Sequence, residues 1–242
     1  MITSPRTELL KGEVDKVRKW VADGGNLLWL IDQDPLRGLQ PLADDLGLQL
    51  TPGIVVDPTA AQLRIPATIA LATSYGVHPI TEGFTYNTAF PFVRQIVTKP
   101  EGSNWHATQL VEVAQRGWVE TGSLDKDLRY DKDRDVHGPV VVAAALERKV
   151  KDKSQRVVVV GGSQFLSNQS IGLLSNLDLG VNMLNWLAAD ENLITVQPRS
   201  RVDSELTLGR APLAMIGFGF LIVLPLAFLL TGGMIWWRRR QT

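Results

Sequence analysis

The segment VVVVGGSQFLSN, residues 157–168, comes closest to a catalytic motif in this chain. Its valines predict a strand, and the turn after them nearly matches the nucleophile elbow G-x-S-x-G, which exposes a serine at the end of a strand. Phe165 stands where the elbow needs its last glycine, and all 3 histidines precede Ser163, whereas hydrolases of this kind place the histidine after the serine. The sequence therefore favours a plain glycine turn at the carboxyl end of a central strand.

Two acidic residues follow another apolar run, NLLWLI at residues 26–31. Ligands of open α/β sheets bind outside the carboxyl ends of strands, so Asp32 and Asp34 could face the same crevice as Ser163 and Gln164. The aspartates could form an acid/base pair, although turn and helix-cap roles are favoured. We treat Asp32, Asp34, Ser163 and Gln164 as candidate residues of a ligand crevice and predict no catalytic residue.

The charged loop DKDLRYDKDRDVHG, residues 125–138, resembles a calcium loop only at its start. Asp131, Asp133 and Asp135 alternate like the first ligands of an EF-hand. Val136 and Val142 then occupy the positions where that loop needs Gly and Glu. Because lysine and arginine lie between the acids, we expect a solvated, charge-neutral loop rather than a metal site.

The remaining residue types exclude several further classes of site. The chain has no cysteine and no phosphate-loop motif, and His78, which precedes Pro79, is interpreted as a turn residue. We therefore expect neither a metal nor a cofactor. Lys and Arg number 25 and balance the 25 Asp and Glu, so the basic surface that nucleic-acid binding requires is not expected.

Hydrophobic periodicity predicts alternating helices and strands, the pattern of an α/β domain. Apolar residues from Leu9 to Val21 recur at helical spacing and end at Gly24-Gly25, and a helix over 177–190 carries Leu177, Val181, Leu184 and Ala188 along one stripe. The other predicted elements are a strand at 26–31, a short helix at 41–47, an extended segment at 48–57, several strands between 65 and 119 (IPATIALATSY, HPITEGF, FPFVRQIV and WHATQLVEV), and clear strands at 138–150 and 155–160.

A stretch from Ala211 to Trp237 has no charged residue over 27 positions, more than the about 20 that a membrane helix needs. Trp236 and Trp237 suit the membrane interface, and the three arginines after them predict a cytoplasmic C-terminus with the preceding domain on the other side. The segment MITSPRTELLKGEV has no export signal that could carry the domain across, so we expect that an N-terminal part is missing.

Six segments, taken in order, resemble the Gldg family, whose members are auxiliary components of ABC-type transport systems: EVDKVRKWVADGGNLLWLID, LGLQLTPGIVVDP, HPITEGF, RVVVVGGSQFLSN, NLDLGVNMLNWLA and LPLAFLLTGGMIWWRRRQT. The resemblance implies an extracytoplasmic α/β domain, flavodoxin-like or similar to class I glutamine amidotransferases, held between two membrane helices, of which only the second is present. The family's turn typically reads G-D-S-D-F-L, so this chain departs from it at Gly162 and Gln164. The resemblance brings no catalytic activity.

Together these observations predict a non-enzymatic, membrane-anchored auxiliary subunit that contacts an ABC permease or its cargo, with ATP hydrolysis supplied by a separate subunit. We expect an extracytoplasmic α/β domain over residues 1–196, a linker over 197–211, a transmembrane helix over 212–237 and a basic cytoplasmic tail over 238–242, in the inner membrane. The alternative is a membrane-anchored enzyme or small-molecule-binding domain that uses the crevice at the strand ends.

Overall fold

The computed structural model describes residues 1–3, 5–32, 35–99, 104–122, 124, 128–188 and 217–241. The chain divides into two units, Met1–Pro198 and Arg199–Thr242, and each is described by itself.

A mixed sheet of four strands forms the centre of the first unit, in the order β1-β11-β10-β7. Strand β1 (Leu27–Leu30) runs parallel to β11 (Lys153–Val160), and β10 (Val140–Val150) is antiparallel to both β11 and β7 (His106–Val113). All four residues of β1 and the last four of β11 are buried, because both faces of this part of the sheet are covered. Ile2 adds a parallel bridge to Trp29 on the other side of β1.

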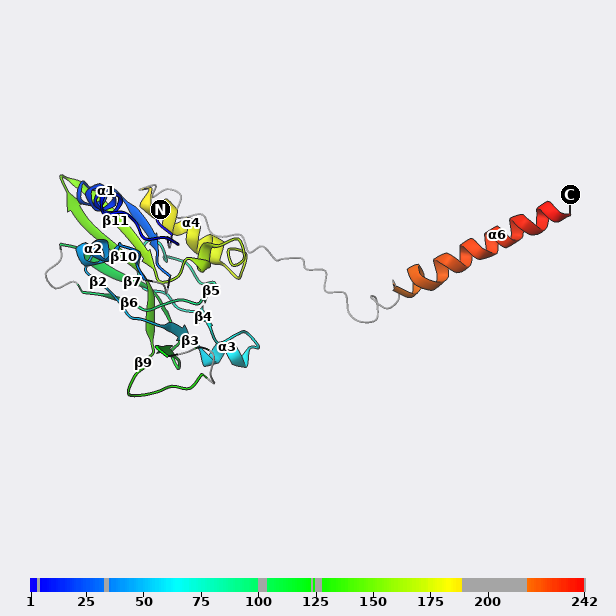
Figure 1. The fold of residues 1–242 in the computed structure, drawn as a ribbon, viewed down its shortest axis with the longest axis horizontal. Helices are drawn as coiled ribbons and strands as arrows, with labels where there is room; N and C mark the ends of the chain where they lie inside the picture. The colour runs from blue at the N-terminus through cyan, green and yellow to red at the C-terminus, as the bar shows by residue number, and fades with distance from the viewer. Residues whose placement is uncertain are drawn as a thin grey trace. The chain divides into compact units, whose positions relative to one another are not determined.

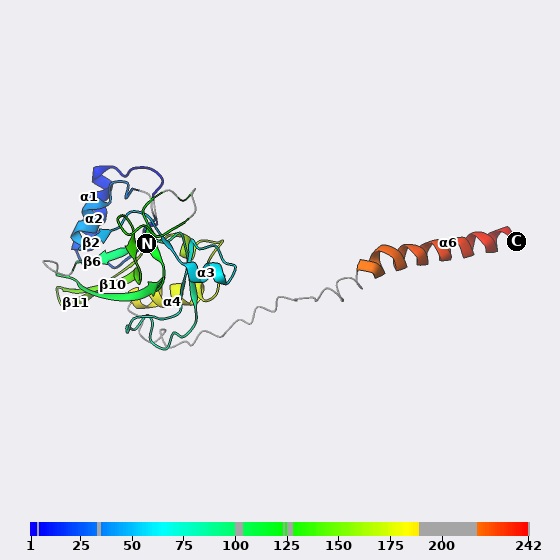
Figure 2. The ribbon, with the colours of Figure 1, turned by 90° about the horizontal axis from the view of Figure 1, so that it is seen from below.

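Helices cover both faces of the central sheet (Figures 1 and 2). On one face, α1 (Lys11–Ala22) and α2 (Gln40–Asp45) lie over a core that includes Trp29 and Val159. On the other face, α4 (Asn176–Leu187) packs against β1 and β11, and its Met183 and Trp186 join a core with Leu28 and Val158. These layers confirm the predicted α/β class, whereas the flavodoxin-like or amidotransferase-like subtype stays a prediction.

Three small sheets complete the described part of the first unit. They pair β2 (Leu48–Leu50) with β6 (Ile96–Thr98), β4 (Ile69–Ala72) with β5 (Thr88–Pro91), and β8 (Trp118–Glu120) with both β3 (Ile54–Val56) and β9 (Val136–His137). Short helices are α3 (Pro58–Gln62) and the 3-10 turn η1 (Gln164–Leu166). The strand predicted over HPITEGF is wrong, because this segment forms consecutive turns in which Thr81 and Phe84 hydrogen-bond back to residues three positions earlier.

The predicted helix after residue 176 is present as α4, but its predicted stripe does not face the sheet. Leu177, Val181 and Leu184 are exposed, while Leu179 and Met183 are buried against the sheet. The helix is apolar on two faces, so periodicity alone cannot tell which of them packs against the sheet.

The second unit is helical over residues 217–240. A π-helical turn, η2 (Gly219–Val223), leads into α6 (Leu224–Arg240), near whose start lies Pro225. Proline lacks a backbone N–H and disturbs the regular ladder, which accounts for an irregular turn beside it. The helical segment Gly219–Arg240 is, by length and composition, able to cross a membrane. The predicted start of this helix, residues 212–216, lies outside the described residues.

Candidate functional site

Two of the four predicted crevice residues, Asp32 and Ser163, meet directly at the carboxyl ends of β1 and β11. The Ser163 backbone N–H donates to Asp32 Oδ1 at 2.5 Å, and the Ser163 hydroxyl donates to Asp32 Oδ2 at 2.7 Å. The parallel pairing that ends with Leu30 opposite Val160 brings both following turns to the same edge of the sheet. Both oxygens of one carboxylate therefore join two turns that lie 131 residues apart in sequence.

A buried arginine, Arg94, supports this junction from a third segment, the loop between β5 and β6. Its guanidinium donates from Nη1 to the backbone carbonyl of Asp32 at 2.8 Å and from Nη2 to the carbonyl of Thr51 at 3.1 Å. Burial lowers the pKa of Arg94, and the charge of Asp32 opposes that shift. Asp32 thus supplies the negative charge that a buried guanidinium needs nearby.

Gly161, the residue that directly follows β11, lets the Arg94 backbone approach closely. The Arg94 N–H donates to the Gly161 carbonyl at 2.7 Å, and a Cβ on Gly161 would lie 2.1 Å from the Arg94 carbonyl oxygen. At the next position, the nearest atom to a Cβ on Gly162 would be Val93 Cα at 3.5 Å, an ordinary contact. Only the first glycine of the pair is required for packing.

The remaining two predicted residues do not join this cluster as described. Gln164 is exposed at the start of η1, and Asp34 lies outside the described residues. In the described part of the chain no histidine hydrogen-bonds to Ser163, whose hydroxyl already donates to a carboxylate. The hydrogen bonds between Asp32 and Ser163 therefore hold the two turns together, and they do not form the arrangement of a serine activated by a base. Gln164, next to Ser163, is exposed to solvent.

Sequence reasoning missed Arg94. It lies within FPFVRQIV, which the sequence suggests is one strand, whereas the structure places β5 and β6 on either side of it. A single arginine inside an apolar segment was the available signal, because an arginine is rarely fully buried unless it is paired. Its partners, however, are backbone carbonyls of distant residues, which leave no pattern in the sequence.

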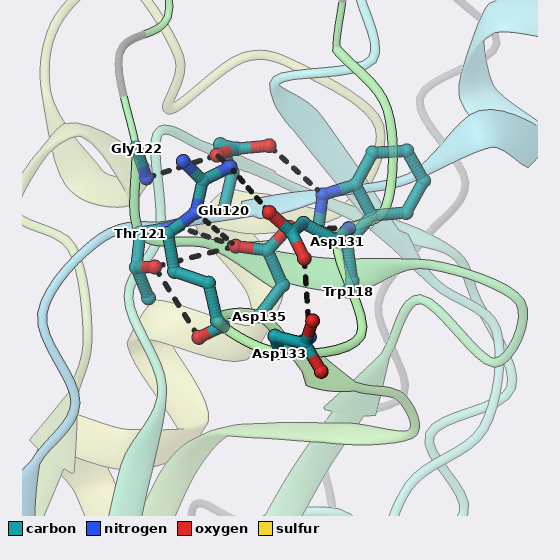
Figure 3. A network of polar contacts seen from close by, with 8 residues as sticks. Trp118, Glu120, Thr121, Gly122, Asp131, Asp133 and Asp135 are labelled. Atoms are coloured by element: carbon teal, nitrogen blue, oxygen red, sulfur yellow. Dashed lines mark hydrogen bonds and ion pairs between the residues drawn. The ribbon is translucent and has the colours of Figure 1, made fainter.

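The charged loop forms a second polar cluster, in which Asp131, Asp133 and Asp135 lie close to Glu120 and Thr121 (Figure 3). Arg134 contacts Glu120 at 3.2 Å, Asp135 at 3.4 Å and Asp131 at 3.9 Å. Asp135 is buried, which alone would raise its pKa, but hydrogen bonds from Asp131 and Thr121 and the charge of Arg134 lower it. The prediction of a solvated loop is therefore wrong for Asp135. Among the described residues, no group of His, Asp and Glu is arranged to hold a metal ion.

His78 lies in the predicted turn, but its side chain is buried. Its ring meets that of Trp186 edge-on at 4.7 Å, and its Nδ1 accepts from the Ile80 N–H at 3.2 Å. Burial, with a smaller effect of the Arg156 charge, lowers the pKa of His78 to about 4. His78 is therefore neutral at pH 7, and its approach to Glu147 at 3.7 Å is not an ion pair at that pH.

Two surface hollows in the described part of the chain are lined by other residues. One of about 360 Å³ lies between α1 and β10, beside Trp105 and three cations, Arg18, Lys19 and Arg148. These cations already have partners: Arg18 binds Asp45, Lys19 binds Asp23, and Arg148 donates to Val21 and Gln155. The other, of about 200 Å³, is lined by residues on β7 and the turn around Tyr75. Neither adjoins the Asp32–Ser163 pair.

Comparison with known proteins identifies the fold and the family. No curated protein matches the chain. Among solved structures, the mmIFT52 N-terminal domain is similar, with a TM-score of 0.57 and 15% identity over 76% of this chain and 74% of that one, which shows a shared fold alone. Residues 1–194 match the auxiliary family described as an ABC-type uncharacterized transport system, and since this match spans most of the sequence, the chain belongs to that family.

Proposed function

We propose that this protein is a membrane-anchored, non-enzymatic auxiliary subunit of an ABC transport system, whose α/β domain contacts the permease or its cargo. The observation that carries the proposal is the family match over residues 1–194, which makes the chain an auxiliary component of such a system. Anchoring by Gly219–Arg240 is supported by the length and apolar composition of that helix.

The chemistry of the strand ends supports a binding role over a catalytic one. Ser163 and Asp32 hydrogen-bond to each other, and Arg94 is committed to backbone carbonyls. These groups hold the turns in place and leave none of the three side chains arranged as an activated nucleophile. The ATP-dependent step belongs to a separate subunit, because the sequence contains no phosphate loop.

For the orientation, we propose an inner-membrane protein with its domain outside the cytoplasm. Arg238, Arg239 and Arg240 end the apolar helix and favour a cytoplasmic C-terminus. On this proposal residues 1–196 are extracytoplasmic, 197–211 form a linker, 212–237 span the membrane and 238–242 form the tail. The resemblance to the Gldg family, which stays a prediction, implies the same topology.

The proposal is tested by purifying the tagged full chain from detergent-solubilised membranes of its own source. We expect it to remain in membranes after an alkaline wash and to co-purify with a permease and an ATPase subunit. A matched variant that carries Leu226→Lys and Leu229→Lys in α6 is expected to lose both properties. The proposal is contradicted if the alkaline wash releases the unchanged chain from the membranes. It is also contradicted if the chain stays in the membranes but co-purifies with neither a permease nor an ATPase subunit.

A second candidate function is the binding of a small polar ligand beside Asp32, Ser163 and Gln164. The observation that favours it is that Asp32 and Ser163 meet at the edge where α/β sheets bind ligands, next to the exposed Gln164. Gln164→Ala separates binding from folding, since its side chain is exposed. A ligand found by thermal-shift screening should stabilise the unchanged protein and lose that effect in Gln164→Ala, and an equal shift in both excludes this site.

A further inference from the structure

Helix α4 has a second apolar face that no described residue covers. Leu177, Val181 and Leu184 are 44%, 43% and 50% exposed, and Ala188 at the C-cap is exposed as well. The opposite face already buries Leu179, Met183, Trp186 and Leu187 in the domain core. The outer face therefore contributes nothing to the core, although apolar residues there carry a cost in solubility.

The spacing of these four residues is that of a two-stranded helical seam. Positions 177, 181, 184 and 188 are separated by four, three and four residues, which is the a/d repeat of a coiled coil. Leu177 and Leu184 take the d positions, and the β-branched Val181 takes an a position. In a parallel coiled coil, leucine at d with a β-branched residue at a favours two strands over three or four.

The size of the face limits how a partner can reach it. Leu173 and Leu174, which are 39% and 59% exposed, come just before the helix in the sequence, so the exposed apolar surface in this region comes from a few partly exposed side chains. A stable complex formed from solution buries about 800 Å² per partner. The seam also spans fewer than the about three heptads that an independent coiled coil needs. It therefore suits a partner that is already concentrated beside it by tethering.

The lack of basic residues in α4 argues against anionic lipid as the partner of this face. Asp178 is the single charged residue of α4, and there is no Lys or Arg between Arg156 and Ala188. A surface that docks on anionic lipid needs basic residues to attract it, so this face is poorly suited to a lipid headgroup layer. A second apolar seam of the same spacing matches it instead.

We propose that α4 packs against α4 of a second copy of this chain in the same membrane, in parallel, with Leu177, Val181 and Leu184 on the seam. This inference rests on the proposed membrane anchoring, which supplies the tether. Two copies held in one membrane meet at a high effective concentration, so a seam of this size is sufficient to pair them.

The sequence contains no cysteine, so any disulfide that forms must come from an introduced residue. Val181→Cys and Leu184→Cys, each in the full chain, are oxidised mildly in native membranes. We expect each to give a disulfide-linked dimer of two copies, because facing seam positions approach within bonding range. Leu10→Cys is the matched control, since Leu10 is 72% exposed next to α1, on the other side of the sheet. Its dimer yield is expected to be at least tenfold lower.

A second variant tests the seam itself. Adding Val181→Lys to Leu184→Cys should lower the dimer yield at least tenfold while the amount of chain in washed membranes stays the same. The proposed packing of α4 against α4 is contradicted if neither seam cysteine gives a disulfide-linked dimer, or if Leu10→Cys gives as much dimer as they do. Release of the unchanged chain by the alkaline wash instead contradicts the proposed function and removes the tether on which the seam depends.

Discussion

At the scale of single residues, Asp32 has the most consequential contacts at the strand ends. We expect Asp32→Ala to lower the free energy of unfolding by about 2 kcal/mol, because two donors of Ser163 lose a charged acceptor. Ser163→Ala keeps the backbone donor and should cost about 1 kcal/mol. Urea unfolding of the detergent-solubilised chain, followed by tryptophan fluorescence, measures both.

The double variant completes the thermodynamic cycle for this pair. Its loss should be smaller than the sum of the two single losses by at least about 0.5 kcal/mol, because the two changes remove one shared interaction. Gln164→Ala, at an exposed neighbouring position, should stay within about 0.5 kcal/mol of the unchanged protein. Additive losses would show that Asp32 and Ser163 do not act on each other.

The two adjacent glycines after β11 give a matched pair of substitutions. Gly161→Ala should destabilise the domain by at least about 2 kcal/mol, because its methyl group would lie 2.1 Å from the Arg94 carbonyl oxygen. Gly162→Ala has ordinary room, with its nearest neighbour at 3.5 Å, and should cost less than about 1 kcal/mol. Thermal unfolding of the two variants side by side measures the difference, and equal midpoints would contradict the close approach.

His78 should make stability depend on pH. Its pKa is about 4 in the folded protein and 6.5 when free, so the unfolded chain takes up the proton first as pH falls. Its contribution is complete above about pH 6.5 and is lost towards pH 4, by as much as about 3 kcal/mol. His78→Asn keeps a hydrogen-bond acceptor but cannot titrate, so it should flatten the unfolding free energy over this pH range. An unchanged slope would mean that His78 is not buried in its neutral form.

At the scale of elements, truncating a side chain on one face of α4 should destabilise the protein, whereas truncating one on the other face should leave the free energy of unfolding almost unchanged. Met183→Ala removes a fully buried side chain and should cost about 2 to 4 kcal/mol. Leu184→Ala, the adjacent residue on the exposed face, should change the unfolding free energy of the detergent-solubilised protein by less than about 0.5 kcal/mol. Urea unfolding compares the two. A large loss from Leu184→Ala would place that side chain in the core.

The sequence predicts the elements of the central sheet and its helices well because their apolar patterns are strong and local. Continuous apolar runs identified β1 and β11, and helical spacing identified α1 and α4. The orientation of α4 was not predictable, since both of its faces are apolar. The strands of the small sheets could not be delimited from the sequence, because three-residue strands such as β2 and β6 have too few residues to show a period.

The candidate site was predictable only in part, for a reason that lies in its topology. Asp32 and Ser163 each follow a buried strand, and parallel pairing of those strands brought them together. Arg94 joins the site from a loop by donating to backbone carbonyls. Every residue has a backbone carbonyl, so no residue type in the sequence indicates such a contact. The charged loop likewise gave no sign that Asp135 would be buried and would bind Thr121.

At the scale of the whole molecule, the basic tail should determine orientation. Replacing Arg238, Arg239 and Arg240 with Glu should lower the fraction of chains whose C-terminus is cytoplasmic, because basic residues beside a membrane helix are retained on that side. Paired reporters fused after Thr242, one active in the cytoplasm and one outside it, measure the fraction. Gln241→Glu is the control and should leave it unchanged, since single acids have little influence.

The pairing of β1 with β11 also determines when the central sheet can form during synthesis. Leu27 lies opposite Val157, a separation of 130 residues, whereas β10 and β11 are joined by a tight hairpin. During synthesis β1 leaves the ribosome long before its partner exists, so it waits with an unpaired edge until the β10–β11 hairpin has formed. A nascent chain paused before residue 153 therefore contains α1, β1, β7 and β10 but not β11, the strand that joins β1 to β10, so β1 and β10 both have an unpaired edge that is open to aggregation.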